Sequence, residues 1–140
     1  AGQGPLQDEI KNKVNGLGLN DKVKFLGQVN DAYKLYQAFD IFLLPSLYEG
    51  LPVVGVEAQA TGLLCELSSD MTKETKVLDT TRFISLERTS EEWAKTILED
   101  YSKFKRHDTT EEITKNNFNI KKEASKLEDK YDELMRQIYE

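Results

Sequence analysis

Hydrophobic positions along the first 90 residues follow two alternating patterns. Short apolar runs predict strands at residues 23–26, 41–44, 63–67 and 83–86. Apolar residues spaced three or four apart predict helices between them, at residues 5–17, 31–39 and 52–61. The run 41–44 contains no polar position, which is typical of a parallel strand covered on both faces. The alternation predicts an α/β domain with right-handed crossovers, whose ligand site lies beyond the carboxyl ends of the strands.

Only helical spacing remains after residue 87. Thr89 and Glu92 are spaced as a capping box at the start of one helix, and a short helix is expected near residues 110–116. The last helix has apolar residues spaced 4, 3, 4, 3 and 4 apart: Ile120, Ala124, Leu127, Tyr131, Leu134 and Ile138. This apolar seam predicts packing on the domain body, with a coiled-coil partner as the alternative. We therefore divide the chain into a partial sheet domain at residues 1–87 and C-terminal helices at residues 88–140 that pack on it.

Composition narrows the possible function classes. The 140 residues suit one domain, and the net charge of -6, with no basic stripe to offset it, disfavours nucleic-acid binding. Cys65 and His107 are the only residues of their kinds, so the sequence offers neither an internal disulfide nor a cysteine-based metal cluster. His107 lies in a charged break between helical patterns and is expected at the surface. No apolar run approaches the roughly 18 residues that a membrane span needs.

The segment at residues 44–58 carries the candidate chemistry. A buried strand ends at Pro45, a short polar loop follows, and a helix begins with Pro52 in its first turn. This is the strand-loop-helix position at which α/β folds bind ligands. The helix start leaves backbone N–H groups unpaired at Val53 and Val54, at the positive end of the helix dipole. A diphosphate is a natural occupant of such a position.

Two carboxylates flank this helix start. Glu49 lies in the loop and Glu57 on the second turn of the helix, and carboxylates suit the vicinal hydroxyls of a ribose or hexose. Gly50 lets the backbone approach a ligand closely. Each glutamate taken singly is also compatible with an ordinary solvated residue, because the helix dipole favours acidic side chains near a helix start.

The two glutamates are separated by seven residues, and Gly50-Leu51-Pro52 follows the first. This string resembles the signature of the family 4 (group 1) retaining glycosyltransferases, which have two Rossmann-like domains. Other similar segments are residues 2–6, 23–27, 36–46 and 57–62, so the resemblance covers about residues 1–101. Gln59 and residues 72–74 are most similar to bacterial enzymes of capsular and exopolysaccharide synthesis. The resemblance implies a Rossmann-like parallel sheet with flanking helices and a helical C-terminal tail, the C-terminal half of a GT-B glycosyltransferase truncated at its N-terminus.

The resemblance also implies a role for each residue of the signature. Glu57 would hold the ribose hydroxyls, and Glu49 would be the catalytic residue beside the donor sugar. The donor-binding residues would be Gly50, Leu51, Pro52, Val53, Val54 and Glu57. The donor would be a nucleotide-diphosphate sugar such as a UDP-sugar, and a hexosyl unit would be transferred with retention, without a metal or cofactor. The acceptor, a growing polysaccharide or a lipid-linked saccharide, would bind to an N-terminal domain that this chain lacks, so the fragment alone is expected to be inactive.

The sequence departs from the family pattern at three positions. Leu64 stands where proline is usual, Ser69 where aspartate is common, and Glu66 lies inside a predicted strand. Because a lone buried carboxylate is costly, we expect Glu66 to reach solvent at a strand end or its segment to be rearranged. The first strands of such a domain would precede residue 1, together with the Arg and Lys that hold the diphosphate. We therefore expect exposed sheet edges, with an unusual sheet or self-association through an edge strand or helix.

Other functions remain open at this point. An epimerase or phosphorylase would share the architecture, but the Gly50-Leu51-Pro52 string and the absence of their histidine and cofactor-lysine motifs disfavour both. A non-catalytic nucleotide-sugar-binding or Rossmann-like regulatory module is the alternative outside enzymes. A receiver-like module is disfavoured because Asp40 precedes its strand instead of following it. The expected location is cytoplasmic, with the full-length enzyme peripheral at the inner face of the membrane.

Overall fold

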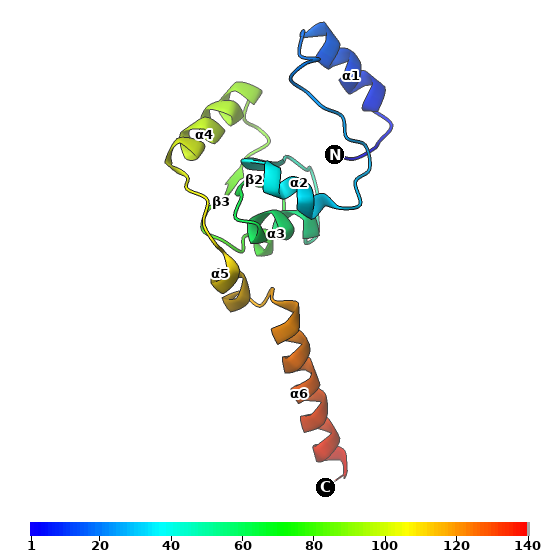
Figure 1. The fold of residues 1–140 in the computed structure, drawn as a ribbon, viewed down its shortest axis with the longest axis vertical. Helices are drawn as coiled ribbons and strands as arrows, with labels where there is room; N and C mark the ends of the chain where they lie inside the picture. Colours follow the sequence, from blue (N-terminus) through cyan, green and yellow to red (C-terminus); the bar gives the residue numbers. More distant parts are fainter. Residues whose placement is uncertain (140) are drawn as a thin grey trace. The chain divides into compact units, whose positions relative to one another are not determined.

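A computed structural model describes residues 1–139 (Figure 1). Its elements are α1 (Gln7–Gly16), α2 (Ala32–Ala38), β1 (Ile41–Leu44), α3 (Val53–Ala60), β2 (Leu64–Ser68), the 3-10 turn η1 (Lys73–Thr75), β3 (Thr81–Ile84), α4 (Ser90–Lys103), α5 (Thr110–Lys115) and α6 (Ile120–Tyr139). The chain divides into two compact units, Ala1–Leu35 and a second that begins at Tyr36. The second unit contains every strand of the described residues.

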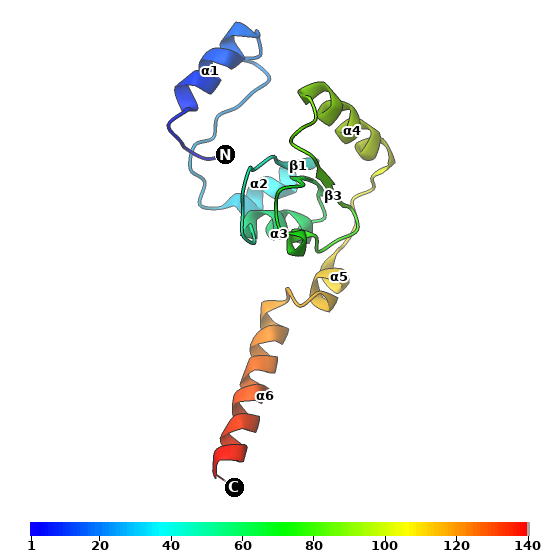
Figure 2. The same ribbon diagram turned by 180° about the vertical axis from the view of Figure 1, so that it is seen from behind.

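The sheet is parallel and has three strands in the order β1-β2-β3, which confirms the predicted α/β class. All five residues of the central strand β2 are buried. Side chains alternate between the two faces of a strand. Thr81 on β3 donates a hydrogen bond to Gln59 of α3, whereas its neighbour Arg82 pairs with Asp100 of α4. The two helices therefore cover opposite faces of the sheet, as the ribbon allows the reader to follow (Figure 2).

One strand prediction was wrong, and a second strand is displaced from its predicted bounds. Residues 23–26 form no strand, and Val23, Phe25 and Leu26 are exposed. An extended segment becomes a strand only when a neighbour pairs with its backbone, and the described unit at residues 1–35 contains no second strand. The last strand lies at Thr81–Ile84, two residues before the predicted 83–86. Its first residue is a buried threonine, which an apolar pattern cannot reveal.

The expected exposure of sheet edges is met at β1. This strand pairs only with β2 among the described residues, and Leu43 on it is 48% exposed. An unpaired strand edge can pair with another chain. Self-association through this edge stays a prediction.

The capping box of α4 is confirmed. The Thr89 hydroxyl accepts from the Glu92 amide at 3.3 Å, and the Glu92 carboxylate accepts from the Thr89 amide at 2.8 Å. Trp93 of this helix donates its indole N–H to the Ser85 carbonyl at 3.0 Å. Asp100 accepts two hydrogen bonds from Arg82, at 2.7 and 2.9 Å. These contacts hold α4 beside β3.

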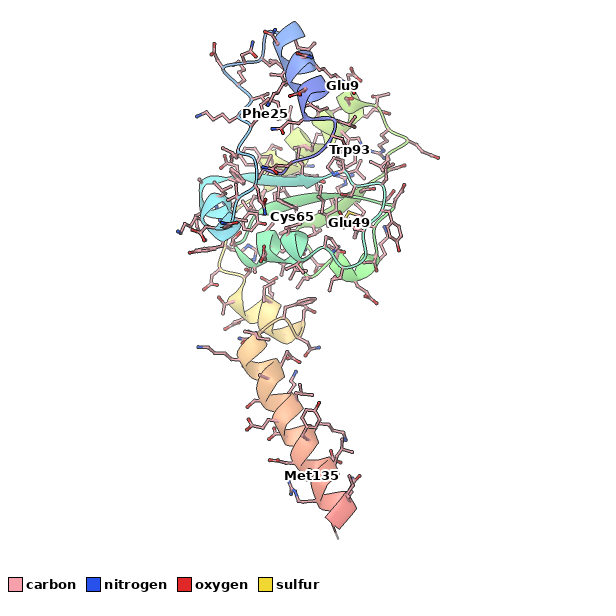
Figure 3. All side chains as sticks on the ribbon, turned by 90° about the vertical axis from the view of Figure 1, so that its right-hand side faces the viewer. Glu9, Phe25, Glu49, Cys65, Trp93 and Met135 are labelled. Atoms are coloured by element: carbon pink, nitrogen blue, oxygen red, sulfur yellow. The ribbon has the colours of Figure 1, made fainter. Side chains whose placement is uncertain are left out.

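The two remaining helices differ in burial. Ile113 of α5 is buried in a cluster with Val56, Val77 and Leu78. The apolar seam of α6 is solvent-exposed, with Ile120 at 79% and Tyr131 at 62%. Figure 3 shows the side chains of this helix on the ribbon, with Met135 labelled. The predicted packing of α6 on the domain at residues 1–87 stays a prediction.

Glu66 lies at the centre of β2 and is fully buried, so both expectations for this residue were wrong. It pairs in register with Leu43 on one side and Arg82 on the other. Neither carboxylate oxygen has a hydrogen-bond partner among the described residues. Burial, and then the neighbouring Asp100 carboxylate, raise the pKa of Glu66 to about 7, while the Arg82 charge opposes the shift. The raised pKa favours the protonated carboxyl, which costs less to bury than a charge.

Candidate functional site

The loop between β1 and α3 is the candidate site. β1 ends at Leu44, and α3 begins after Pro52, whose extended φ and ψ of -72° and 106° turn the chain into the helix. The first helical hydrogen bond runs from the Gly55 amide to the Pro52 carbonyl at 2.9 Å. The amides of Val53 and Val54 precede that bond and therefore have no carbonyl within the helix to bind. Both residues are exposed, at 64% and 42%, so a ligand can reach this end of the helix.

Glu49 is fixed within its loop by a short-range contact. The Ser46 hydroxyl donates to the Glu49 carboxylate at 3.1 Å, and Glu49 is half-buried (Figure 3). The two residues before it, Leu47 and Tyr48, are 82% and 85% exposed. A Cβ added at Gly50 would meet no atom within 4 Å, so nothing inside the chain requires a glycine there. The loop therefore holds one oriented carboxylate beside an open stretch of backbone.

Glu57 is exposed on the second turn of α3, and one side chain donates to it. The Tyr36 hydroxyl lies 3.4 Å from the Glu57 carboxylate. Tyr36 is only 4% exposed, and its ring packs edge-on against Phe42 with centroids 5.9 Å apart. Burial, and then the negative charge of Glu57, raise the pKa of Tyr36, so the phenol remains a donor. Sequence reasoning missed this role, because the spacing of Tyr36 on its helix indicated only an apolar face.

The buried face of α3 is joined to the segment after β2 by Gln59, which is fully buried and makes five hydrogen bonds. Its amide nitrogen donates to the carbonyls of Gly55 and Thr75, at 3.0 and 2.7 Å. Its carbonyl oxygen accepts from the amides of Val77 and Leu78 and from the Thr81 hydroxyl. The side chain thereby holds residues 75–81 against the helix that carries Glu57. The sequence contained no signal for this network beyond the position of Gln59 in the similar segment at residues 57–62.

The far ends of α2 and α3 are held together by Arg106. Its guanidinium donates to the carbonyls of Tyr36, Phe39 and Thr61 at distances of 2.7 to 3.1 Å. Thr109 adds hydrogen bonds from its hydroxyl to the last carbonyls of α3. A cation at the carboxyl end of a helix is favoured by the helix dipole. The two helices that carry Tyr36 and Glu57 are therefore fixed to each other from outside the signature.

His107 lies at the surface, as expected, with its side chain 43% exposed. Its Nε2 lies 2.8 Å from the Glu112 carboxylate, and that contact raises the pKa of the imidazole. Within residues 1–139 no cluster of three histidine, cysteine or acidic side chains could hold a metal ion. Likewise, none of the helices described has the length and apolar character needed to cross a membrane.

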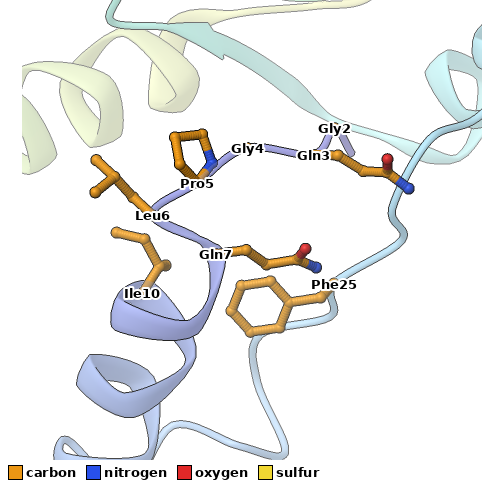
Figure 4. A pocket seen from close by; sticks show the side chains of 8 residues that line it. All are labelled: Gly2, Gln3, Gly4, Pro5, Leu6, Gln7, Ile10 and Phe25. Carbon is orange, nitrogen blue, oxygen red and sulfur yellow. The ribbon is translucent and has the colours of Figure 1, made fainter.

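The first unit contains a hollow that none of the residues 49–57 lines. It has a volume of about 340 Å³ and lies at the turn of residues 2–7, with Ile10 and Phe25 completing the lining (Figure 4). Gly2 adopts a φ of 125°, and its amide donates to the Gly27 carbonyl. The left-handed backbone favours glycine at this turn.

Comparison with known proteins gives a consistent set of matches. The family described as "Glycosyl transferases group 1" matches residues 1–117. The chain is 44% identical over 98 residues to EpsF of Bacillus subtilis, named as a glycosyltransferase, which covers 69% of this chain and 26% of EpsF. It is 41% identical over 69 residues to the UDP-Gal:alpha-D-GlcNAc-diphosphoundecaprenol alpha-1,3-galactosyltransferase of Escherichia coli, covering 49% of this chain and 18% of that enzyme.

A third relative is the Vi polysaccharide biosynthesis protein VipC/TviE of Salmonella typhi, 37% identical over 62 residues, with 44% of this chain and 11% of that protein covered. No solved structure matches the chain. The chain spans about a quarter or less of the length of these three relatives.

Proposed function

This chain belongs to the group 1 glycosyl transferases, the family that the signature at residues 49–57 predicted, and we propose that it binds the nucleotide-diphosphate sugar donor of a glycosyltransferase. One observation carries the proposal. A single strand-loop-helix unit presents the unpaired amides of Val53 and Val54 and the exposed carboxylate of Glu57, one turn further along the helix. The amides suit the diphosphate, and the carboxylate suits the ribose hydroxyls.

Glu49 takes the catalytic role in this proposal. Its carboxylate is oriented by Ser46 in the loop that leads to Gly50 and Leu51, where exposed backbone faces the donor sugar. The charge that develops on the leaving diphosphate is stabilised by the positive end of α3, including the Pro52–Val54 turn. Transfer is proposed to proceed with retention and without a metal or cofactor.

The acceptor is proposed to be a saccharide, either a growing polysaccharide or a lipid-linked one. The Escherichia coli relative is named for a UDP-Gal donor and a diphosphoundecaprenol-linked acceptor, which supports a UDP-sugar and a lipid-linked acceptor here. A lipid-linked acceptor places the complete enzyme at the inner face of the membrane, bound peripherally. Because cell fractionation separates peripheral from soluble proteins, recovery of the complete enzyme wholly in the soluble fraction would count against that location.

The experiment that tests donor binding is calorimetric titration of the complete protein with UDP and GDP, repeated with Glu57→Gln. Loss of a hydrogen bond to a charged group costs about 1.5–3 kcal/mol, so we expect affinity for the better nucleotide to fall by about tenfold to more than a hundredfold. The substitution removes the charge and keeps the shape of an exposed side chain, so folding should be unaffected.

Glu128→Gln on α6 is the matched control, because it makes the same chemical change on an exposed position of another helix. Its affinity should equal that of the parent. If Glu57→Gln binds both nucleotides as the parent does, the ribose assignment is wrong. The alternative of a non-catalytic nucleotide-sugar-binding module predicts the same binding but no consumption of donor by the complete protein.

A further inference from the structure

Among the described residues, the only side chain that hydrogen-bonds to Glu57 is the phenol of Tyr36, and the two residues come from different helices. Tyr36 lies in the last turn of α2, and Glu57 in the middle of α3. The phenol is almost fully buried, whereas the carboxylate it reaches is exposed. A buried donor has one fixed position, so it restricts the orientation of an exposed and otherwise freely rotating carboxylate.

Two further contacts fix the position of the phenol. The ring packs edge-on against Phe42 of β1, with an interplanar angle of 85°. The Tyr36 carbonyl accepts from Arg106 at 3.0 Å, and the same guanidinium nitrogen donates to Thr61, just after α3, at 2.7 Å. The backbone of Tyr36 is thus tied to the end of the helix that carries Glu57. None of these contacts involves the loop at residues 45–52.

We propose that Tyr36 is a positioning residue, which holds the Glu57 carboxylate in the orientation that accepts both ribose hydroxyls of the donor nucleotide. The inference rests on the proposed function of Glu57. Tyr36 does not touch the nucleotide itself. Its contribution is to remove rotational freedom from Glu57 before the ligand arrives, and preorganisation of this kind increases affinity by lowering the ordering cost of binding.

The test measures binding of UDP and of its 2′,3′-dideoxy analogue to the complete protein and to its Tyr36→Phe variant. Phenylalanine keeps the ring packing against Phe42 and removes only the hydroxyl. We expect UDP affinity to fall by about threefold to tenfold, because the variant loses only the hydrogen bond between Tyr36 and Glu57, which is long and partly exposed. The affinity for the dideoxy analogue should not change, because that ligand offers no hydroxyls to Glu57. Tyr101→Phe on α4 is the matched control and should bind both ligands as the parent does.

The double substitution separates positioning from a general structural role. In a Glu57→Gln background, Tyr36→Phe should have no further effect on UDP affinity, because the carboxylate it orients is gone. An equal loss for both ligands, or a further loss in that background, would assign Tyr36 a structural role and overturn the proposal. Unchanged UDP affinity in Tyr36→Phe would overturn it as well.

Glu57→Asp tests the same idea on an exposed position, where failure to fold is not expected. The shorter side chain keeps the charge but draws the carboxylate away from the Tyr36 hydroxyl. Parent-like UDP affinity in Glu57→Asp would mean that orientation is unimportant and would refute the positioning role. If Glu57→Gln itself leaves UDP binding unchanged, the proposed function fails. If Glu57→Gln weakens binding and Tyr36→Phe does not, only the positioning role fails.

Discussion

The buried Glu66 should make the stability of this protein depend on pH around neutrality. The substitution Glu66→Gln keeps the size of the side chain and removes its ability to ionise. Glu66 is fully buried at the centre of β2, without a hydrogen-bond partner for either oxygen among the described residues. The parent must therefore either hold a proton at this position or carry a buried charge between Arg82 and Asp100.

The magnitude follows from the shift in pKa. Burial, with the Asp100 carboxylate beside it, raises the pKa of Glu66 from 4.5 to about 7 in the folded chain. The raised folded-state pKa means that the stability linked to the proton is fully present below pH 4.5 and is lost as the pH rises through 7. One pKa unit corresponds to ~1.4 kcal/mol, so the loss above the folded-state pKa amounts to about 3 kcal/mol.

The assay is urea unfolding of parent and Glu66→Gln at several pH values between 5 and 9. The free energy of unfolding of the parent should fall relative to that of Glu66→Gln by about 2.5 kcal/mol across this range, because part of the loss already occurs below pH 5. Any constant difference reports the fit of the amide and does not bear on ionisation. Glu87→Gln, on an exposed residue, should track the parent at every pH. Identical pH profiles for the parent and Glu66→Gln would show that ionisation of Glu66 does not contribute to stability in this range.

Two further substitutions test the packing behind the site. Gln59→Leu removes five buried hydrogen bonds and leaves the Val77 and Leu78 amides unpaired. The free energy of unfolding should therefore fall by about 4 kcal/mol. A loss below about 1 kcal/mol in urea unfolding would mean that these hydrogen bonds do not stabilise the fold. Gly62→Ala places a Cβ 2.6 Å from the His107 carbonyl at a φ of 73°. The thermal midpoint of Gly62→Ala should fall well below that of the control Gly18→Ala, because Gly18 has a similar φ of 66° but open space around it. Equal midpoints would mean that the contact between the new Cβ and the His107 carbonyl is relieved at little cost.

The strands show where an apolar pattern is sufficient to predict a strand and where it is not. Leu64–Ser68 forms the buried central strand, as its apolar run predicted, because it pairs on both sides and lies under helices. Ile41–Leu44 also forms a strand, but the prediction that both of its faces are covered was wrong, since Leu43 is 48% exposed. Residues 23–26 have an equally apolar pattern and form no strand. A run of side chains records a tendency to be extended, whereas a strand requires a second backbone beside it. Strand pairing depends on the whole chain, so a short stretch of sequence does not show whether a partner strand lies beside it.

Buried polar residues account for the other strand error. Thr81 and Glu66 are both inside the sheet, the first satisfied by Gln59 and the second tolerated by a raised pKa. A hydrophobicity pattern counts both as surface residues, so it began β3 two residues late and expected Glu66 at a strand end or in a rearranged segment. The compensating interactions come from α3 and α4. The sequence contains those partners but does not indicate that they meet Thr81 and Glu66.

In the candidate site, too, the local features could be predicted from the sequence and the contact between helices could not. Its local part was predictable, since the position of Pro52 at the helix start and the spacing of Glu49 and Glu57 are fixed by consecutive residues. The Tyr36 hydrogen bond was not predictable, because it depends on how two helices lie against each other. That arrangement is held by Arg106, 70 residues from Tyr36 and 45 from Thr61. The signature therefore identifies the residues proposed to meet the donor, whereas the contacts that orient Glu57 come from residues that lie far from it in the chain.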